Sequence, residues 1–365
     1  MPALPLRPEL VGIEPYGAPQ LDVPVLLNVN ENPYPPSDAV VAEVTERVAA
    51  AARGLNRYPD RDFLDLRTEL AGYLDVESGV SLGAEQVWAA NGSNEVMLHL
   101  LQAFGGPGRT ALSFAPTYSM YPVYARDTHT RWVAARREDD FSVDPDAARA
   151  AIAEIAPSVV LLASPNNPTG TALGLDVVRA VLDAAGEVPG GCVVVVDEAY
   201  AEFRRTGTPS ALTLLEAYPH LAVSRTMSKA FGMAGARLGY LAASAELVDA
   251  LRVVRLPYHL SAVTQAVARA ALAHADELMA QVDSLRSERD ALVVWLRERG
   301  LQVADSDANF VMFGRFTERR TLWQGLLDRG VLIREVGPPG WLRVSVGTPA
   351  ETAAFKEALV EVAGL

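Results

Sequence analysis

Residues 193–203 read VVVVDEAYAEF, and this stretch decides the fold. Its four consecutive valines show no alternation of apolar and polar residues, which predicts a central strand of a parallel sheet, buried on both faces. Asp197 follows at the carboxyl end of that strand, where open α/β sheets bind their ligands. A carboxylate there can pair with a protonated pyridine nitrogen, and the Tyr200 phenol can reach an oxygen of the same ring. An acidic residue that merely caps the next helix would explain Asp197 but not Tyr200.

A second stretch, RTMSKAFGMAGARLGY at residues 225–240, supplies the reactive group. The amine of Lys229 can hold an aldehyde cofactor as a Schiff base. Ser228 and Arg237 add a hydroxyl and a guanidinium that can clamp a phosphate, and Thr226 opens the same run. Together a lysine, a hydroxyl and an arginine indicate pyridoxal phosphate (PLP). In isolation such a window is more commonly a solvated turn, so the interpretation depends on the other motifs.

A third stretch, SPNNPTG at residues 164–170, follows another buried apolar run at residues 159–162. Its Asn-Pro and Thr-Gly pairs predict a tight turn that leaves the sheet. Asparagine, proline and glycine are ordinary turn residues. What ordinary turns do not predict is the order of the three motifs along the chain.

In that order the chain resembles the fold-type I PLP-dependent aminotransferases of the class I/II branch, from about residue 10 onward. The resemblance implies that Asn167, directly before a proline, hydrogen-bonds the ring hydroxyl oxygen of PLP. It also implies that Asp197 pairs with the pyridine nitrogen and that Tyr200 assists at the ring oxygen. Lys229 would be both the Schiff-base lysine and the group that moves the proton.

The cofactor phosphate has a further candidate site in WAANGSNEVMLHLLQAF, residues 88–104, which begins as a strand and becomes helical near Ser93. The N–H groups of Gly92, Ser93 and Asn94 would then lie free at a helix N-terminus, which is a natural anion site. A simple serine N-cap is the alternative, and Ser228 and Arg237 favour the phosphate. By the resemblance, Tyr118 stacks on the PLP ring.

Four more stretches resemble the histidinol-phosphate aminotransferases within that branch: NVNENPYPP at residues 28–36, NRYPDRDF at 56–63, SDANFVMF at 306–313 and WLRVSVGT at 341–348. The resemblance implies amino transfer from L-histidinol phosphate to 2-oxoglutarate, giving imidazole acetol phosphate and L-glutamate in histidine biosynthesis. An aromatic amino-acid aminotransferase, or a related decarboxylase of phosphate substrates, is the alternative within the same fold.

The substrates of that reaction suggest where they bind. Histidinol phosphate carries a dianionic phosphate, and the second substrate carries two carboxylates, so the site needs guanidinium groups. Arg334 and Arg343 are the candidates, because bidentate contacts suit both anions. By the resemblance Tyr16 closes over the imidazole and Asn32 also contacts the substrate. Tyr58 would reach the cofactor phosphate of a neighbouring subunit, so a homodimer with shared active sites is expected.

Composition limits the other classes. The 365 residues carry a net charge of -13, which argues against nucleic acid or an anionic membrane as a partner. Cys192 is the only cysteine, and the five histidines show no metal-ligand spacing, so neither disulfides nor a metal are expected. The start, MPALPLRPEL, lacks the basic and apolar regions of a secretion signal, and no membrane span is evident, so a cytoplasmic protein is expected.

The predicted organisation is an irregular Pro-rich arm (1–36), a large doubly wound, mostly parallel α/β domain that binds PLP (37–260) and a small α+β domain (261–365). Residues 79–83 match the GxSxG pattern of a hydrolase nucleophile elbow, but that elbow needs a strand before it and a helix after it. Here a helix is predicted before it and a strand after it. A ligand-sensing regulator would need a DNA-binding module, for which the arm is too short.

Overall fold

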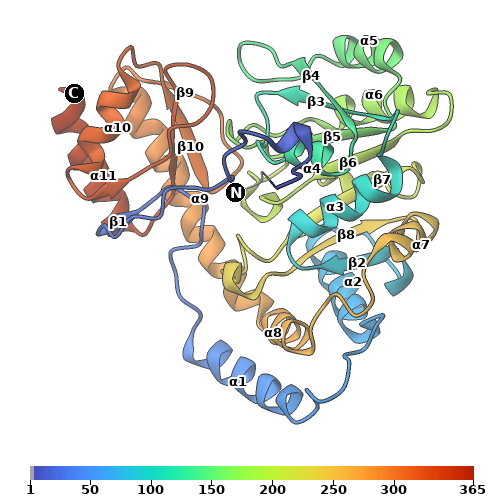
Figure 1. Ribbon diagram of the computed structural model, residues 1–365. Helices are drawn as coiled ribbons and strands as arrows, with labels where there is room; N and C mark the ends of the chain where they lie inside the picture. Colours follow the sequence, from blue (N-terminus) through green and yellow to red (C-terminus); the bar gives the residue numbers. More distant parts are fainter. Residues whose placement is uncertain (1–3) are drawn as a thin grey trace.

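The computed structural model describes residues 4–365 and has an α/β architecture in two parts (Figure 1). The larger part is built on a seven-stranded sheet of order β2-β8-β7-β6-β5-β3-β4. Only β8 runs antiparallel to its neighbours β2 and β7, so the mostly parallel sheet is confirmed. The strands are β2 (Val87–Ala90), β3 (Thr110–Ala115), β4 (Arg131–Arg136), β5 (Val159–Ala163), β6 (Val193–Asp197), β7 (Leu221–Thr226) and β8 (Gly239–Ala243).

The valine run forms β6, which lies between β5 and β7 in the middle of the sheet. Burial on both faces explains why its sequence does not alternate. Helices pack on this sheet and on one another: α1 (Asp38–Ala52), α2 (Leu64–Ser78), α3 (Ser93–Phe104), α4 (Tyr121–Asp127), α5 (Pro145–Ile155), α6 (Leu175–Gly186), α7 (Ala245–Val254) and α8 (Ala262–Ala273). Residues 79–83 follow helix α2 and precede β2, which confirms that they form no nucleophile elbow.

The smaller part contains a three-stranded antiparallel sheet of order β12-β10-β9. Its elements are α9 (Ala275–Glu298), β9 (Gln302–Val303), β10 (Phe310–Gly314), α10 (Arg319–Leu327), β11 (Val331–Leu332), β12 (Leu342–Ser345) and α11 (Pro349–Ala363). Figure 1 shows α10 and α11 beside β9 and β10, with the long helix α9 running from this part towards α8. None of the helices in residues 4–365 is long and apolar enough to cross a membrane.

The N-terminal arm is more ordered than its proline content predicts. It contains a short 3-10 helix, η1 (Pro8–Leu10), and a strand, β1 (Val25–Leu26), which pairs in parallel with β11 of the small part. Leu27 is buried in the core of the small part. Two residues are too few to show an alternating pattern, so the arm was wrongly expected to be irregular throughout.

The chain does not pass from one hydrophobic core to the other at residue 260. Helix α8 packs against α1 and α2, and its Ala268 and Ala271 belong to the core of the large part. Along α9 the core changes, from Leu278 in the large part to Leu292 in the small part. The expected start of the small domain at residue 261 therefore precedes the change of core, because α8 carries small apolar residues for packing on the large part.

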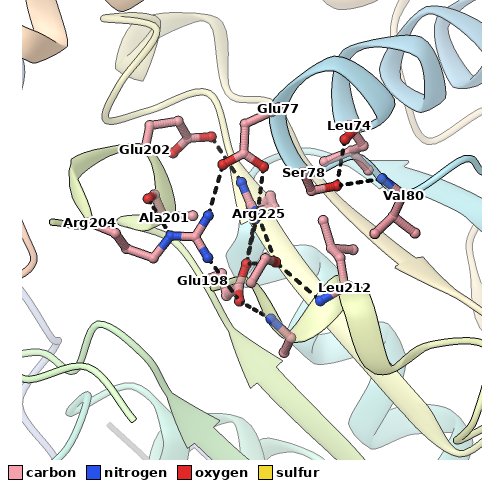
Figure 2. Close-up of polar contacts among 12 residues, drawn as sticks. Leu74, Glu77, Ser78, Val80, Glu198, Ala201, Glu202, Arg204, Leu212 and Arg225 are labelled. Atoms are coloured by element: carbon pink, nitrogen blue, oxygen red, sulfur yellow. Dashed lines mark hydrogen bonds and ion pairs between the residues drawn. The ribbon is translucent and has the colours of Figure 1, made fainter. Parts of the chain in front are cut away.

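A buried ion cluster at the carboxyl ends of β6 and β7 ties these strands to α2 (Figure 2). Arg225 pairs with Glu198 at 2.7 Å, with Glu77 at 3.1 Å and with Glu202 at 3.3 Å. Arg204 pairs with Glu77 at 2.8 Å. These five side chains are here called the ion cluster. Four of them lie within a few residues of the motif residues Asp197, Tyr200 and Thr226 in sequence, and Glu77 comes from α2.

Candidate active site

A cavity of about 980 Å³ opens where the parallel strands end, between the large part, the small part and the arm. All the residues that the sequence predicts for the site line this cavity, except Asn32 and Tyr58. They are Tyr16, Ser93, Asn94, Tyr118, Asn167, Asp197, Tyr200, Thr226, Ser228, Lys229, Arg237, Arg334 and Arg343. The carboxyl ends of parallel strands meet at one edge of a sheet, and this brings the separate motifs together.

Lys229 lies in the turn that follows β7 and is half-buried. The Nζ atom donates a hydrogen bond to the backbone carbonyl of Val29 at 3.0 Å. Burial, with a smaller contribution from Arg343, lowers the pKa of Lys229 from 10.5 to about 8. A measurable fraction of this amine is therefore neutral near pH 7, as a nucleophile and a base must be.

Asp197 ends β6, and its side chain is buried. Tyr121 donates its hydroxyl to Oδ2 at 3.0 Å, and the backbone N–H of Ala199 donates to Oδ1 at 3.3 Å. Burial raises the pKa of Asp197 to about 6. Both partners are neutral, so a cationic group on a ligand would complete the pairing that a buried carboxylate needs.

Tyr121, which lies three residues after Tyr118 in the segment that follows β3, was not among the predicted site residues. The sequence did indicate it, because a second aromatic residue three positions after Tyr118 can reach the same part of the cofactor site. Tyr124 adds a further contact, donating to Oδ1 of Asn94 at 2.7 Å.

An anion site is formed by the start of α3 and the arginine before β8. Gly92 precedes the helix with φ +84°, and a Cβ atom there would lie 2.5 Å from Nη2 of Arg237. Glycine therefore allows the guanidinium to approach the helix N-terminus, where the first N–H groups have no partner within the helix. The expectation that the N–H of Gly92 is free is wrong, because it donates to the carbonyl of Ala90 at 2.8 Å. Arg237 Nη1 donates to the hydroxyl of Ser228 at 3.4 Å. The side chain of Ser93 does not cap the helix, because the N-cap residue is Gly92, and this favours the phosphate interpretation.

A second cationic region comes from the small part. Arg343 on β12 and Arg334 form a backbone bridge, with N···O distances of 2.9 Å in both directions. Arg343 is only 5% exposed and donates to Oδ1 of Asn167 at 2.6 Å and to the carbonyl of Asn28 at 2.8 Å. Burial lowers its pKa to about 10, so the guanidinium stays charged.

The two remaining candidates lie outside the cavity. Asn32 donates its amide to the carbonyl of Ala230 at 3.2 Å and accepts from the N–H of Tyr34 at 3.0 Å, so its side chain ties the arm to the Lys229 turn. The ring of Tyr58 is 79% exposed and stacks on Tyr258, with centroids 4.4 Å apart. Contact of Asn32 with substrate and contact of Tyr58 with a second subunit stay predictions.

The donor set fits PLP at both of its charged ends. A helix N-terminus, a hydroxyl and Arg237 suit its phosphate, and the buried Asp197 suits a protonated ring nitrogen. Lys229 is the amine that an aldehyde requires. Among residues 4–365 no cluster of histidine, cysteine, aspartate and glutamate side chains is placed to hold a metal ion.

Comparison with known proteins agrees with this geometry. The sequence profile of the family "Aminotransferase class I and II" matches residues 23–359. The chain therefore belongs to that family, and it is a PLP-dependent aminotransferase.

Within the family its relatives are histidinol-phosphate aminotransferases. The enzyme of that name from Thermobifida fusca is 64% identical over 99% of this chain and 96% of its own length. Histidinol-phosphate aminotransferase 3 of Burkholderia lata is 62% identical over the same shares. The crystal structure of histidinol-phosphate aminotransferase from Sinorhizobium meliloti, in complex with pyridoxal-5'-phosphate, superposes with a TM-score of 0.82. The superposition covers 93% of this chain and 91% of the Sinorhizobium meliloti chain. Because the two sequences are only 24% identical, this likeness supports the fold alone.

Proposed function

We propose that this protein transfers the amino group of L-histidinol phosphate to 2-oxoglutarate, giving imidazole acetol phosphate and L-glutamate in histidine biosynthesis. The observation that carries the proposal is the pair Arg334–Arg343 in the same cavity as Lys229. Two adjacent guanidinium groups suit the phosphate of one substrate and the carboxylate of the other. The relatives that are 62–64% identical carry the name of this activity.

The residues that would hold PLP come from the carboxyl ends of four strands, from the start of α3 and from the turn before β8. Asn167 and Tyr200 would contact the ring oxygen, Asp197 the ring nitrogen, and Tyr118 the ring face. The phosphate would be bound by Ser93, Asn94, Thr226, Ser228 and Arg237. When bound, the cofactor supplies an electron sink for the carbanion that forms at the substrate carbon.

The protein's own side chains position the substrate and move its proton. Nζ of Lys229 would take the proton from the substrate carbon that bears the amino group, and the same amine would return a proton to complete the amino transfer. Its lowered pKa makes this base available near neutral pH. Arg343 and Arg334 fix the anionic end of the substrate and so orient the bond that breaks.

An aromatic amino-acid aminotransferase is the second candidate. Tyr16, Tyr118 and Trp132 line the cavity and could hold a phenyl ring as readily as an imidazole. Arg343 would bind a carboxylate as readily as a phosphate.

A half-reaction distinguishes the two. The PLP-loaded protein is mixed separately with L-histidinol phosphate and with L-phenylalanine, and the absorbance of the lysine-bound cofactor is followed. Rapid loss of that absorbance at low histidinol phosphate, with a much weaker response to phenylalanine, is expected. The reverse preference would contradict the proposed substrate and retain the class of reaction.

We also propose that the protein is a cytoplasmic homodimer in which Tyr58 completes the phosphate site of the partner. The exposed stack of Tyr58 on Tyr258 supports this, because an aromatic pair with one ring 79% exposed is a typical interface element. Sedimentation of the loaded protein at micromolar concentration tests the dimer, and a monomer that keeps full activity would contradict it.

A further inference from the structure

Asn30 has an unusual place in the chain. It belongs to the N-terminal arm, yet it is only 2% exposed and forms hydrogen bonds with both parts of the molecule. Its backbone has a φ of +56°, in the left-handed region that asparagine tolerates better than most residues. Asn309 of the small part holds this backbone, donating its amide to the Asn30 carbonyl at 3.0 Å. A strained position held from several sides is a reason to look for a function.

The side-chain amide of Asn30 has a defined direction. The hydroxyl oxygen of Ser345 accepts a hydrogen bond from the backbone N–H of Asn30 at 2.9 Å. The hydroxyl hydrogen of Ser345 is therefore free to be donated to Oδ1 of Asn30, at 3.1 Å. Oδ1 is therefore an acceptor, and the NH₂ group is the one that lies 3.0 Å from the hydroxyl oxygen of Tyr200. Asn30 donates to Tyr200.

A second amide donates to the same oxygen. The guanidinium of Arg343 has only donors, so the atom of Asn167 that faces it at 2.6 Å is Oδ1. The NH₂ group of Asn167 then lies 3.3 Å from the Tyr200 oxygen. A hydroxyl has two lone pairs and one hydrogen. With both lone pairs occupied by amides, the hydrogen of Tyr200 must point elsewhere, and Tyr200 lines the cavity.

We propose that Asn30 is a positioning residue of the cofactor site: with Asn167 it fixes the Tyr200 hydroxyl as a hydrogen-bond donor to an anionic ring oxygen of the ligand. This rests on the proposed function, which places Tyr200 at that oxygen. Accepting two bonds also makes a phenol a stronger donor, because hydrogen bonds in a chain polarise one another.

The surroundings keep this phenol protonated. Burial raises the pKa of Tyr200 above its usual value, Arg343 and the two amides lower it in part, and Asp197 raises it. Lys229 and Arg237 also line the cavity that Tyr200 faces. A neutral phenol whose lone pairs are occupied can act on the ligand only by donating.

The test is a pH titration of the absorbance of the lysine-bound cofactor, without substrate. A donor at the ring oxygen stabilises its negative charge, and so lowers the pKa at which the link between Lys229 and the cofactor loses its proton. Asn30→Gly removes the amide and tolerates the left-handed backbone. It should raise this pKa by about 0.5, and Tyr200→Phe by about 1. The double variant should match Tyr200→Phe alone, because the amide acts only through the phenol.

Asn309→Ala is the matched control, since it loosens the Asn30 backbone and keeps the amide. It should lower the melting temperature and leave the titration unchanged, and melting curves also verify that every variant is folded. An unshifted pKa in Asn30→Gly, additive shifts in the double variant, or an equal shift in Asn309→Ala would overturn the inference and leave the proposed function standing. If Tyr200→Phe itself does not move the titration, the inference falls together with the role of Tyr200. A loaded protein with no titrating absorbance would refute the proposed cofactor chemistry instead.

Discussion

The ion cluster and the cavity both bury charge, but they treat it in opposite ways. In the ion cluster Arg225 has three carboxylates within 3.3 Å (Figure 2). Burial alone would lower the pKa of Arg225, but Glu198, Glu77 and Glu202 raise it well above the usual value. In the cavity, Lys229 and Asp197 bond only to neutral groups, and burial moves both of their pKa values towards neutrality.

This difference separates scaffold from site. Charges that are paired within the chain hold two strand ends in register and have nothing left to offer a ligand. Charges with neutral partners are costly in the folded protein and are stabilised when a ligand of opposite charge arrives. Variants in the two regions should therefore fail in different assays.

The largest effect is expected from Lys229→Ala. Loss of the base that moves the proton should lower the half-reaction rate by about 1,000-fold or more, and PLP should be held only non-covalently. The melting temperature of the cofactor-free protein should not fall, because a buried amine with one carbonyl partner is removed. Stopped-flow absorbance and melting curves measure the two effects. Substantial surviving turnover would contradict the mechanism.

Arg225→Met should produce the opposite pattern. It leaves three carboxylates around an uncharged side chain and should cost about 3–5 kcal/mol of unfolding free energy. The protein that remains folded should keep most of its activity per bound PLP. Denaturant unfolding measures the loss. The exposed pair of Arg149 with Asp146 provides the control, because Arg149→Met should change the unfolding free energy by less than about 1 kcal/mol. If Arg225→Met lost no more unfolding free energy than Arg149→Met, the ion cluster would not be stabilising.

Asp197→Asn should separate function from stability within one residue. Loss of the charged partner of the ring nitrogen should lower the half-reaction rate by about 10–100-fold. The folded pKa of Asp197, about 6, lies above its unfolded value of 3.8, so folding favours the protonated form. Its contribution to stability is present below pH 3.8 and is lost as the pH rises through 6. The melting temperature of the cofactor-free wild type should therefore fall, relative to that of Asp197→Asn, as the pH rises from about 4 to 6. Parallel curves would contradict burial of an unpaired carboxylate.

The smallest effect is expected from Tyr58→Phe. If its hydroxyl reaches the cofactor phosphate of a partner, PLP should dissociate about three to ten times faster, the effect of one solvent-exposed hydrogen bond. Stacking on Tyr258 needs only the ring, so the stability of the dimer should not change. Cofactor release is followed by absorbance after dilution into buffer that contains a PLP trap. An unchanged release rate would count against the shared site.

The sequence predicted the cavity better than its surroundings for a physical reason. Asp197, Asn167 and Lys229 follow strands at short, fixed spacings, so strand order alone brings them together. The ion cluster, the Asn30–Tyr200 bond and the two-residue strand β1 depend on partners far away in the chain, and no local period reports them. Arg343 was predicted from the anionic groups of the expected substrates and from the resemblance of residues 341–348 to histidinol-phosphate aminotransferases, not from a local period.

The pairing of the arm with the far end of the chain also sets the order in which the protein can be made. Asn30 bonds to Ser345, which is 315 residues away, and β1 joins a strand that leaves the ribosome near the end of synthesis. The large sheet can collapse while the chain is still growing, since domains fold as units from the N-terminal side. The arm must wait, and with it the amide that directs Tyr200. A nascent chain therefore carries Lys229 and Asp197 for some time before it has an assembled site.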